Sequence, residues 1–369
     1  MKKIFLLIAT SIVFSTYAQN SNSLNSILQN YKRSANNVLR IEYNIQRIDT
    51  FASGGVWNHN GFAFIEREKS DKLFGFYFSG IRFDINEQDI YDGKNEIWID
   101  KNKKSYKIEK PGEGYLGSPG GQMIVKELLF PDTTYNNVKL LNETKDSYIL
   151  EYQYKDDTTF NVTNETKIIE LSKSNYLPIK ITLSYLRLGN RAVNQVKISK
   201  LKINSKITSP IDQIKKELTS YKLIEETKPT KSLVDTKASE FLLSEIINRN
   251  DKIELPKDKL ALLDFWEVWC APCILSLPKI EKISKQYSDN LQVIGIVTDD
   301  TLNARKFINQ KGITFTNLIG NKSLLTKYEI DSYPRYFIVD KNGNILKEYY
   351  GFSSQIEKDI LKYLEKSKK

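Results

Sequence analysis

Two patterns of apolar and polar residues divide the chain. From Ser21 to about Lys206, apolar and polar residues mostly alternate with a period of two, which is typical of half-buried β-strands. From about Lys237 to Lys369, short apolar runs alternate with segments of helical spacing. The sequence therefore predicts two domains, an N-terminal antiparallel β-rich domain (residues 19–208) and a C-terminal α/β domain (residues 237–369).

The first pattern opens with a short helix, Leu24–Ser34, and continues as many strands with few helices. This order predicts an antiparallel sheet that is curved or closed. A glycine-rich loop, Gly112–Gly121, carries no nucleotide-binding motif, so we expect a mobile loop there. An apolar helix, Gln122–Phe130, should follow it and end at Pro131. The predicted strands are Val38–Ile48, Val56–Arg67, Leu73–Ser79, Ile81–Ile85, Asp89–Tyr91, Glu96–Asp100, Ser105–Ile108, Val138–Leu141, Tyr148–Tyr154, Lys167–Leu171, Ile179–Leu188 and Ala192–Ile203.

Residues 209–236 are predicted to be a linker with a short helix. Ser209-Pro210 precedes a polar helix, Ile211–Tyr221, and Glu225–Thr236 has the composition of a linker, with the domain boundary near residue 228. The second pattern then predicts the order β-α-β-α-β-α-β-β-α. Its elements are Leu260–Trp266, Ile274–Tyr287, Leu291–Val297, Leu302–Gln310, Phe315–Ile319, Lys322–Tyr328, Arg335–Val339, Ile345–Tyr349 and Ser353–Lys366.

The first eighteen residues have the pattern of a secretory signal peptide. Lys2 and Lys3 precede an apolar stretch, Ile4–Phe14, and Ala18 marks the expected cleavage point. The apolar stretch is too short for a comfortable spanning helix, and an uncleaved anchor is the minor alternative. We therefore expect export into an oxidising compartment.

The net charge of +10 does not indicate a nucleic-acid partner. The 55 basic and 45 acidic residues are interspersed along the chain, which is typical of a solvated surface. A weak attraction to anionic membrane surfaces is left open.

Both cysteines of the chain lie in one short segment, Leu260–Cys273, which reads L-A-L-L-D-F-W-E-V-W-C-A-P-C. The apolar run predicts a buried strand that turns into a helix at the cysteines, and a thiol at a helix N-terminus is favoured as thiolate. Cys270 is then the exposed nucleophile and Cys273 the resolving thiol. The alternative, half of a zinc site, lacks ligands because His59 is the only histidine. We expect redox chemistry, with no metal and no cofactor.

At these residues the sequence resembles the thioredoxin superfamily, in particular its periplasmic TlpA-like thiol-disulfide reductases. Asp264–Cys273 resembles the D-F-W-x-x-W-C-x-P-C motif, Ser332–Pro334 the cis-proline loop, and Ala238–Phe241 the entry to the domain. The resemblance covers about Lys237 to Lys369 and implies a thioredoxin-like fold and a periplasmic location. Many relatives carry a glutamate three residues after the second cysteine, whereas this chain has Ser276.

Six further residues are assigned roles around the cysteines. Asp264 should be buried, with a raised pKa that suits it to take the proton of Cys273, although an ordinary strand-end acid is the alternative. Tyr333-Pro334 should be a cis peptide whose backbone pairs with an extended substrate segment. Trp269, with Trp266, forms an apolar rim or belongs to the core. Glu267 is expected on the exposed side, where it tunes substrate choice.

The N-terminal pattern resembles the periplasmic lipoprotein-carrier (LolA-like) fold, an open half-barrel with an apolar concave face. On one interpretation, four apolar residues of the predicted helix line a cavity for an acyl chain or the apolar tail of a partner. On the other, they fill the core of the barrel, as side chains of small barrels usually do. These residues are Ile124, Val125, Leu128 and Leu129.

Two classes of function compete. In the first, the protein reduces disulfides of exported proteins, receives electrons from a membrane-delivered donor and uses its N-terminal domain for docking or lipid binding. In the second, it binds lipid or lipoprotein, and the thioredoxin module is accessory or acts as a disulfide isomerase. A peroxidase is disfavoured because no P-x-x-x-T-x-x-C run precedes either cysteine.

Overall fold

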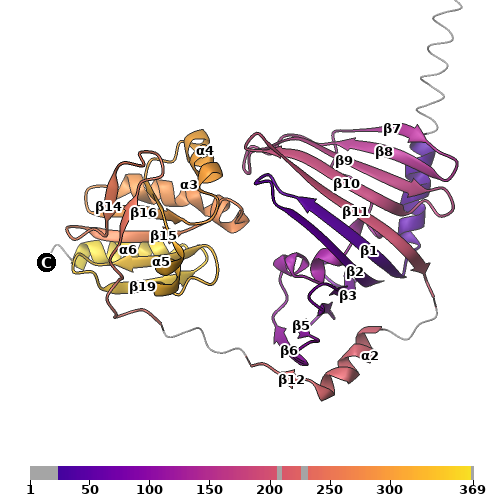
Figure 1. Cartoon of the computed structure of the whole chain (residues 1–369), viewed down its shortest axis with the longest axis horizontal. Helices are drawn as coiled ribbons and strands as arrows, with labels where there is room; N and C mark the ends of the chain where they lie inside the picture. The colour runs from indigo at the N-terminus through magenta and orange to yellow at the C-terminus, as the bar shows by residue number, and fades with distance from the viewer. Residues whose placement is uncertain (1–23, 206–209, 226–231, 367–369) are drawn as a thin grey trace, which may run out of the picture. The chain divides into compact units, whose positions relative to one another are not determined.

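The computed structural model describes residues 24–205, 210–225 and 232–366 (Figure 1). They form two compact units, of which the first contains residues 24–156, 163–205 and 210–225 and the second contains residues 157–162 and 232–366. The predicted signal peptide lies outside the described residues. Within the described ranges, no helix is both long enough and apolar enough to cross a membrane.

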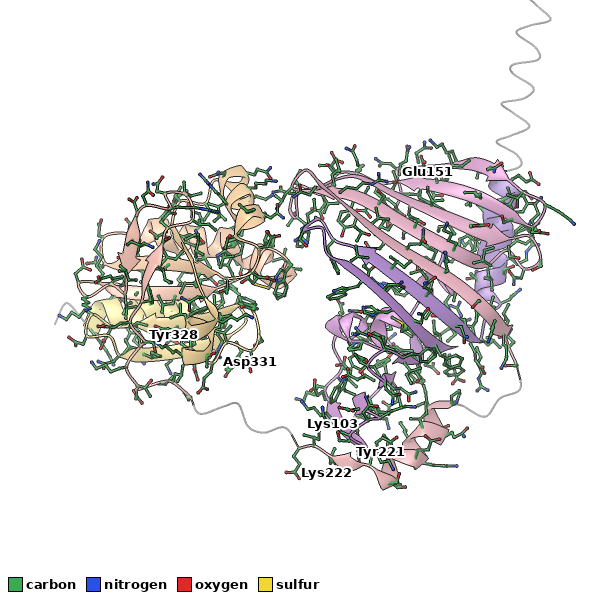
Figure 2. All side chains as sticks on the ribbon, viewed as in Figure 1. Lys103, Glu151, Tyr221, Lys222, Tyr328 and Asp331 are labelled. Carbon is green, nitrogen blue, oxygen red and sulfur yellow. A yellow bond between two sulfur atoms is a disulfide. The ribbon has the colours of Figure 1, made fainter. Side chains whose placement is uncertain are left out.

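A twelve-stranded sheet dominates the N-terminal unit. Its strands are β1 (Arg40–Thr50), β2 (Val56–Arg67), β3 (Phe76–Arg82), β4 (Glu87–Tyr91), β5 (Glu96–Asp100), β6 (Ser105–Glu109), β7 (Asn137–Glu143), β8 (Ser147–Gln153), β9 (Val162–Ser172), β10 (Pro178–Arg187), β11 (Asn190–Ile203) and β12 (Lys222–Leu223). Two meanders, β1 to β6 and β7 to β11, join where β11 pairs antiparallel with β1. Strand β12 adds parallel to β6, near the labelled Lys103 and Lys222 (Figure 2). The sheet order runs from β12 to β7, so the sheet is open and has two edges.

Apolar side chains pack on both faces of this sheet. In β1, Ile41, Tyr43 and Ile45 alternate onto the face that carries the main core, together with the helix over residues 24–36. On the opposite face a second cluster, which includes Phe64 of β2, is covered by α2 (Pro210–Glu217) and η4 (Leu218–Ser220). This packing places residues 210–223 within the N-terminal unit. The half-barrel shape remains a prediction.

The predicted helix Gln122–Phe130 is wrong. The segment consists of two 3₁₀ turns, η2 (Gly121–Met123) and η3 (Lys126–Leu128), after an earlier turn, η1 (Glu113–Gly117). The Tyr43 hydroxyl enters between the two turns, donates to the Met123 carbonyl at 3.0 Å and accepts from Val125 N at 2.8 Å. Because a side chain uses the backbone groups that a helix would pair internally, the helix is interrupted.

The two predicted strands Leu73–Ser79 and Ile81–Ile85 are one strand, β3, which runs through Gly80. A Cβ atom at Gly80 would lie 2.0 Å from the carbonyl oxygen of Gly120, so glycine is needed for the two backbones to approach. The Gly120 N–H donates to the buried Asp89 carboxylate at 2.5 Å. The end of the glycine-rich loop is thus packed against β3 and β4.

A five-stranded sheet forms the centre of the C-terminal unit. Its strands are β15 (Leu260–Phe265), β16 (Leu291–Val297), β17 (Thr316–Ile319), β18 (Arg335–Val339) and β19 (Ile345–Tyr350), in the order β17-β16-β15-β18-β19. The first three are parallel, and β18 and β19 are antiparallel to their neighbours. The helices are α3 (Ala271–Gln286), α4 (Thr301–Lys311), α5 (Lys322–Lys327) and α6 (Gln355–Lys366). The predicted β-α-β-α-β-α-β-β-α order is therefore confirmed from β15 onward. Strand β15 lies at the centre and leads directly to the cysteines.

A short hairpin before β15 was not predicted. It pairs β13 (Leu242–Ser244) with β14 (Lys252–Glu254). Leu243 of this hairpin packs in one core cluster with Phe265 and Phe337 of the central strands. Tyr328, labelled in Figure 2, belongs to the same cluster, and its ring centroid lies 5.1 Å from that of Phe265.

Candidate redox site

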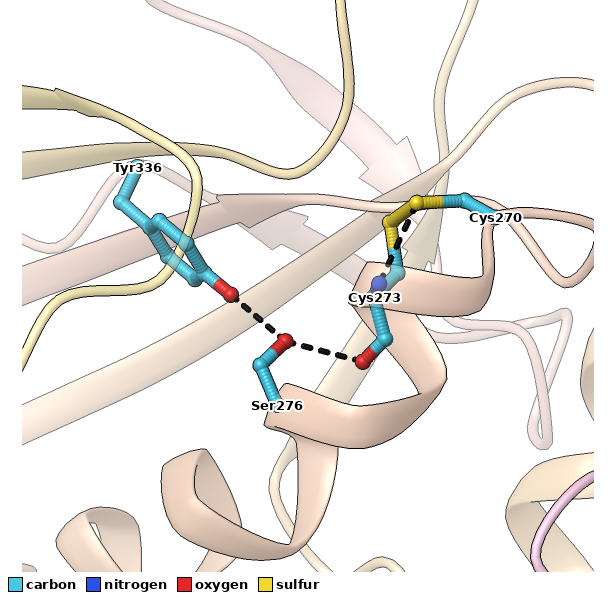
Figure 3. Close-up of a disulfide and its surroundings, with 4 residues drawn as sticks. All are labelled: Cys270, Cys273, Ser276 and Tyr336. Atoms are coloured by element: carbon cyan, nitrogen blue, oxygen red, sulfur yellow. Dashed lines mark hydrogen bonds between the residues drawn. A yellow bond between two sulfur atoms is a disulfide. The ribbon is translucent and has the colours of Figure 1, made fainter. Parts of the chain in front are cut away.

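The two cysteines lie where a turn leads from β15 into α3. Cys270 is the N-cap residue of α3, and its Sγ atom accepts a hydrogen bond from Cys273 N at 3.2 Å. The sulfur atoms form a disulfide with an Sγ–Sγ distance of 2.12 Å (Figure 3). The placement of the pair at a helix N-terminus is as the sequence indicated. Cys270 is the outer sulfur, but with only 5% of its surface accessible, against 0% for Cys273, it is not the exposed residue expected.

Asp264 is fully buried on β15, and its side chain has no hydrogen-bond partner within the described structure. Burial raises the pKa of this carboxyl well above its usual range. It is paired in register with Tyr336 of β18. The carboxyl thus has the environment that the sequence indicated.

Ser276 and Tyr336 connect β18 to the cysteine helix (Figure 3). The Ser276 hydroxyl donates to the Cys273 carbonyl at 2.8 Å and accepts from the Tyr336 hydroxyl at 2.8 Å. Both side chains are buried, and burial raises the pKa of Tyr336, so its phenol stays protonated and serves as a donor. The side chain of Ser276 is therefore one half of a neutral hydroxyl pair with Tyr336.

The predicted exposed position of Glu267 is wrong, because its side chain is fully buried. Its Oε1 atom accepts hydrogen bonds from Thr298 N at 2.8 Å and Asp299 N at 3.0 Å. These donors belong to the loop between β16 and α4. These two hydrogen bonds hold the carboxylate in its buried position. The alternation of apolar and polar residues cannot predict this position, because Glu267 follows the end of β15.

Trp269 and Tyr333 form an aromatic rim beside the cysteine turn. Trp269 keeps 52% of its surface exposed, and its ring lies edge-on to Tyr333 with a centroid distance of 5.6 Å. The Trp269 indole N–H donates to Asp299 Oδ2 at 3.0 Å. The Tyr333–Pro334 peptide is cis, as predicted. Trp266 belongs to the core instead, where it is fully buried and its indole N–H donates to Asn317.

His59 lies within β2, where its ring faces Asp84 with an Nδ1–Oδ2 distance of 3.2 Å. Its side chain is only 12% exposed, so His59 is a partly buried strand residue. No group of three histidine, cysteine, aspartate or glutamate side chains is arranged to hold a metal ion in the part of the chain that the structure describes.

Comparison with known proteins assigns the C-terminal unit to a family. The redoxin family matches residues 240–364. The thioredoxin-like protein YneN of Bacillus subtilis is 31% identical over 124 residues, which cover 32% of this chain and 73% of YneN. The chain belongs to the redoxin family of thioredoxin-like proteins.

Other relatives of this thioredoxin-like chain are thiol-disulfide oxidoreductases by name. ResA of Geobacillus thermodenitrificans is 29% identical over 145 residues, covering 38% of this chain and 82% of ResA. A solved structure, a putative thiol:disulfide interchange protein DsbE from Chlorobium tepidum, is 26% identical, covers 35% of this chain and 92% of its own, and has a TM-score of 0.32. The protein is a thioredoxin-like oxidoreductase.

Three residues beside the thioredoxin-like site were not predicted from the sequence. Tyr336 lies in β18, where only apolar residues follow it, and its single hydroxyl was the available signal. Ser276 was noted only as a departure from the relatives. Asp299 lies in a loop with no pattern of its own, and only the folded chain brings its carboxylate to the Trp269 indole.

Proposed function

We propose that this protein is an exported thiol-disulfide reductase that acts on disulfides of exported proteins through Cys270 and Cys273. The main supporting observation is a cysteine pair at the N-terminus of α3 that is joined as a disulfide. The fully buried Asp264, without a hydrogen-bond partner in the described structure, adds an acid–base group on the strand leading to that pair.

The reaction begins from the reduced pair. The Cys270 thiolate, favoured by the unpaired N–H groups at the start of α3, attacks one sulfur of the substrate disulfide and expels the other as thiolate. Cys273 then gives its proton to Asp264 and attacks the Cys270 sulfur of the mixed disulfide. This second exchange expels the remaining substrate thiol and leaves the Cys270–Cys273 disulfide, so two electrons have passed to the substrate.

The residues between the cysteines support the direction of electron flow. Ala271 and Pro272 place no cation there, so stabilisation of the thiolate depends on the helix terminus. Strongly oxidising couples have a greatly stabilised reduced form, with potentials near −120 mV. We therefore expect a potential nearer to about −270 mV, the value for thioredoxin. Such a couple donates electrons, and in an oxidising compartment a membrane-delivered donor must reduce it again.

The N-terminal unit is proposed to dock the enzyme to its partner or to lipid. Of the residues proposed to line an acyl-chain cavity, Val125, Leu128 and Leu129 are buried in the main core, which favours their role as core filling. A separate groove of about 560 Å³ in this unit is lined by polar residues, such as Asn44 and Lys180, and by apolar ones, such as Phe83 and Ile198. Because the proposed cavity residues fill the core, a partner protein is favoured over an acyl chain, and a lipid or lipoprotein-binding protein with an accessory redox module is the alternative.

Substrate trapping tests the proposed function. The Cys273→Ser variant should accumulate mixed disulfides with exported proteins, because the first exchange proceeds and the second cannot. The Cys270→Ser variant should trap little and should not reduce insulin. Equal trapping by both variants would contradict the assigned roles. If lipid co-purifies with the N-terminal unit and no protein is trapped, the lipid-binding alternative is favoured.

A further inference from the structure

Glu267 is a buried carboxyl group for which the exchange reaction above has no use. The N–H groups of Thr298 and Asp299 both donate to one oxygen, Oε1. The other oxygen, Oε2, is buried and has no partner in the described structure. One half of the carboxyl group is thus held in place, and the other half is free to carry a proton.

The backbone of Glu267 is hydrogen-bonded to that of Cys270, the residue that carries the attacking sulfur. The Glu267 carbonyl accepts a hydrogen bond from Cys270 N at 3.1 Å, which closes a β-turn over the four residues. The Cα atoms of the first and last residues of a β-turn lie within about 7 Å of each other. Both residues are buried, and like charges on residues that are neighbours in a turn repel each other more strongly when they are shielded from water.

The groups around Glu267 are mostly acidic or neutral. The Asp299 carboxylate raises its pKa, while the N–H groups of Thr298, Asp299 and Asp300 lower it. Burial is the largest influence and raises the pKa of Glu267 to about 7. From the cis-proline loop, Tyr333 is within electrostatic reach, because the charges of Glu267 and Asp299 raise its pKa. No lysine or arginine of the described residues is among the largest influences on the pKa of Glu267.

We infer that Glu267 is a redox-linked proton site, which takes up a proton when the Cys270–Cys273 disulfide is reduced and releases it when the disulfide forms again. The inference needs only a reversible cysteine couple and does not depend on the direction of electron flow in the proposed function.

The proton and electron balance of the step is complete. A dithiol reductant becomes a disulfide and gives up two electrons and two protons, while the Cys270–Cys273 bond breaks. One proton goes to Cys273. The other goes to Glu267, so Cys270 remains a thiolate beside a neutral carboxyl group. Because Oε2 takes the proton, both hydrogen bonds to Oε1 survive and the loop between β16 and α4 need not move.

The dependence of the redox potential on pH tests this inference. In the oxidised protein, Glu267 is half ionised near pH 7. In the reduced protein, the charge of the Cys270 thiolate raises the pKa of Glu267, so the carboxyl group stays protonated to higher pH. At pH 7, reduction of the wild-type protein should therefore take up about half a proton more than reduction of Glu267→Gln, and the difference should approach one proton near pH 8. For a two-electron couple, one proton changes the slope of potential against pH by about 30 mV per pH unit.

The expected result is a shallower slope between pH 7 and 8 in Glu267→Gln, with potentials measured against dithiothreitol on the full chain. The Cys270 thiolate should also form at lower pH in this variant. Glu281→Gln is the matched control, because Glu281 accepts a backbone hydrogen bond from Thr314 in the same unit and should leave the slope unchanged. Equal slopes in the wild type and in Glu267→Gln would overturn the inference, while a reversible potential in both would leave the proposed function intact.

A second measurement avoids any folding defect of the variant. Carbon-detected NMR titration of the glutamate carboxyl groups in the wild-type protein should show one carboxyl with a pKa near 7 in the oxidised form and a higher pKa in the reduced form. The same pKa in both redox forms would overturn the inference.

Discussion

Asp264 and Tyr336 are paired across the antiparallel ladder of β15 and β18, yet they share no hydrogen bond. The Tyr336 hydroxyl donates to Ser276 instead, and Asp264 is left without a donor. A carboxylate that accepted the phenol proton would have its pKa lowered, whereas burial without a donor keeps it raised. Because the Tyr336 hydroxyl donates to Ser276, the pKa of Asp264 stays raised, which is the condition that its proposed role as proton acceptor requires.

The Asp264→Asn variant should slow the resolving step, because the amide has the shape of the carboxyl group but cannot take the proton of Cys273. Rapid-mixing measurement of mixed-disulfide decay between pH 6 and 8 should show a rate that rises with pH in the wild type and is lower and flatter in the variant. Asp289→Asn, a change of an exposed aspartate, is the control. Identical pH profiles for wild type and Asp264→Asn would rule out this role.

The same variant should stabilise the oxidised protein at neutral pH. The folded-state pKa of Asp264 is raised above its unfolded value, so the folded state holds its proton over a range where the unfolded state has lost it. The free energy of unfolding of the wild type therefore falls as pH rises from the unfolded pKa toward the folded one. Urea unfolding at pH 7 should show a gain on the order of 1–3 kcal/mol in Asp264→Asn, and no gain near pH 3.

Tyr336→Phe should affect stability more than chemistry. It removes one buried hydrogen bond to Ser276, which should lower the free energy of unfolding by about 1–2 kcal/mol. Since the phenol stays protonated at neutral pH, it takes no proton from Cys273, and the resolving rate should change less than in Asp264→Asn. A loss in rate as large as that of Asp264→Asn would show that the hydroxyl pair takes part in proton transfer.

Trp269→Ala should weaken the binding of protein disulfides. Removing a half-exposed ring from the rim should raise KM by on the order of tenfold, equivalent to about 1.4 kcal/mol, with little change in kcat. Trp269→Phe keeps an aromatic ring but loses the hydrogen bond to Asp299, so its KM should lie between those of the wild type and of Trp269→Ala. A fall in kcat at unchanged KM would instead place Trp269 in the exchange step.

Tyr43→Phe tests the account of the interrupted helix in the N-terminal unit. The variant removes the partner of both the Met123 carbonyl and Val125 N, and both bonds are buried. Unfolding of the variant should cost about 1–3 kcal/mol less than unfolding of the wild type, with the redox potential unchanged. Unchanged stability would mean that water or another group replaces the hydroxyl.

The strongest sequence signals were those that depend on local chemistry. In three places a pattern coincides with a residue type that permits few local structures. These are strand β15, the two cysteines at the start of α3 and the Tyr333–Pro334 peptide. Glu267 was misplaced because it follows the end of β15, where alternation no longer tells which way a side chain points. The segment after Gly120 was misplaced because Tyr43, about eighty residues earlier in the chain, takes the hydrogen bonds on which a local prediction depends.

The redox potential of the Cys270–Cys273 couple decides whether the protein acts as a thiol-disulfide reductase. The full chain is equilibrated with mixtures of reduced and oxidised glutathione at pH 7, and the fraction of reduced cysteines is counted by thiol alkylation. A reductase should have a potential close to the value of about −270 mV for thioredoxin, as expected for an enzyme that donates electrons. A potential close to about −120 mV would make the protein an oxidant of thiols and would contradict the proposed function.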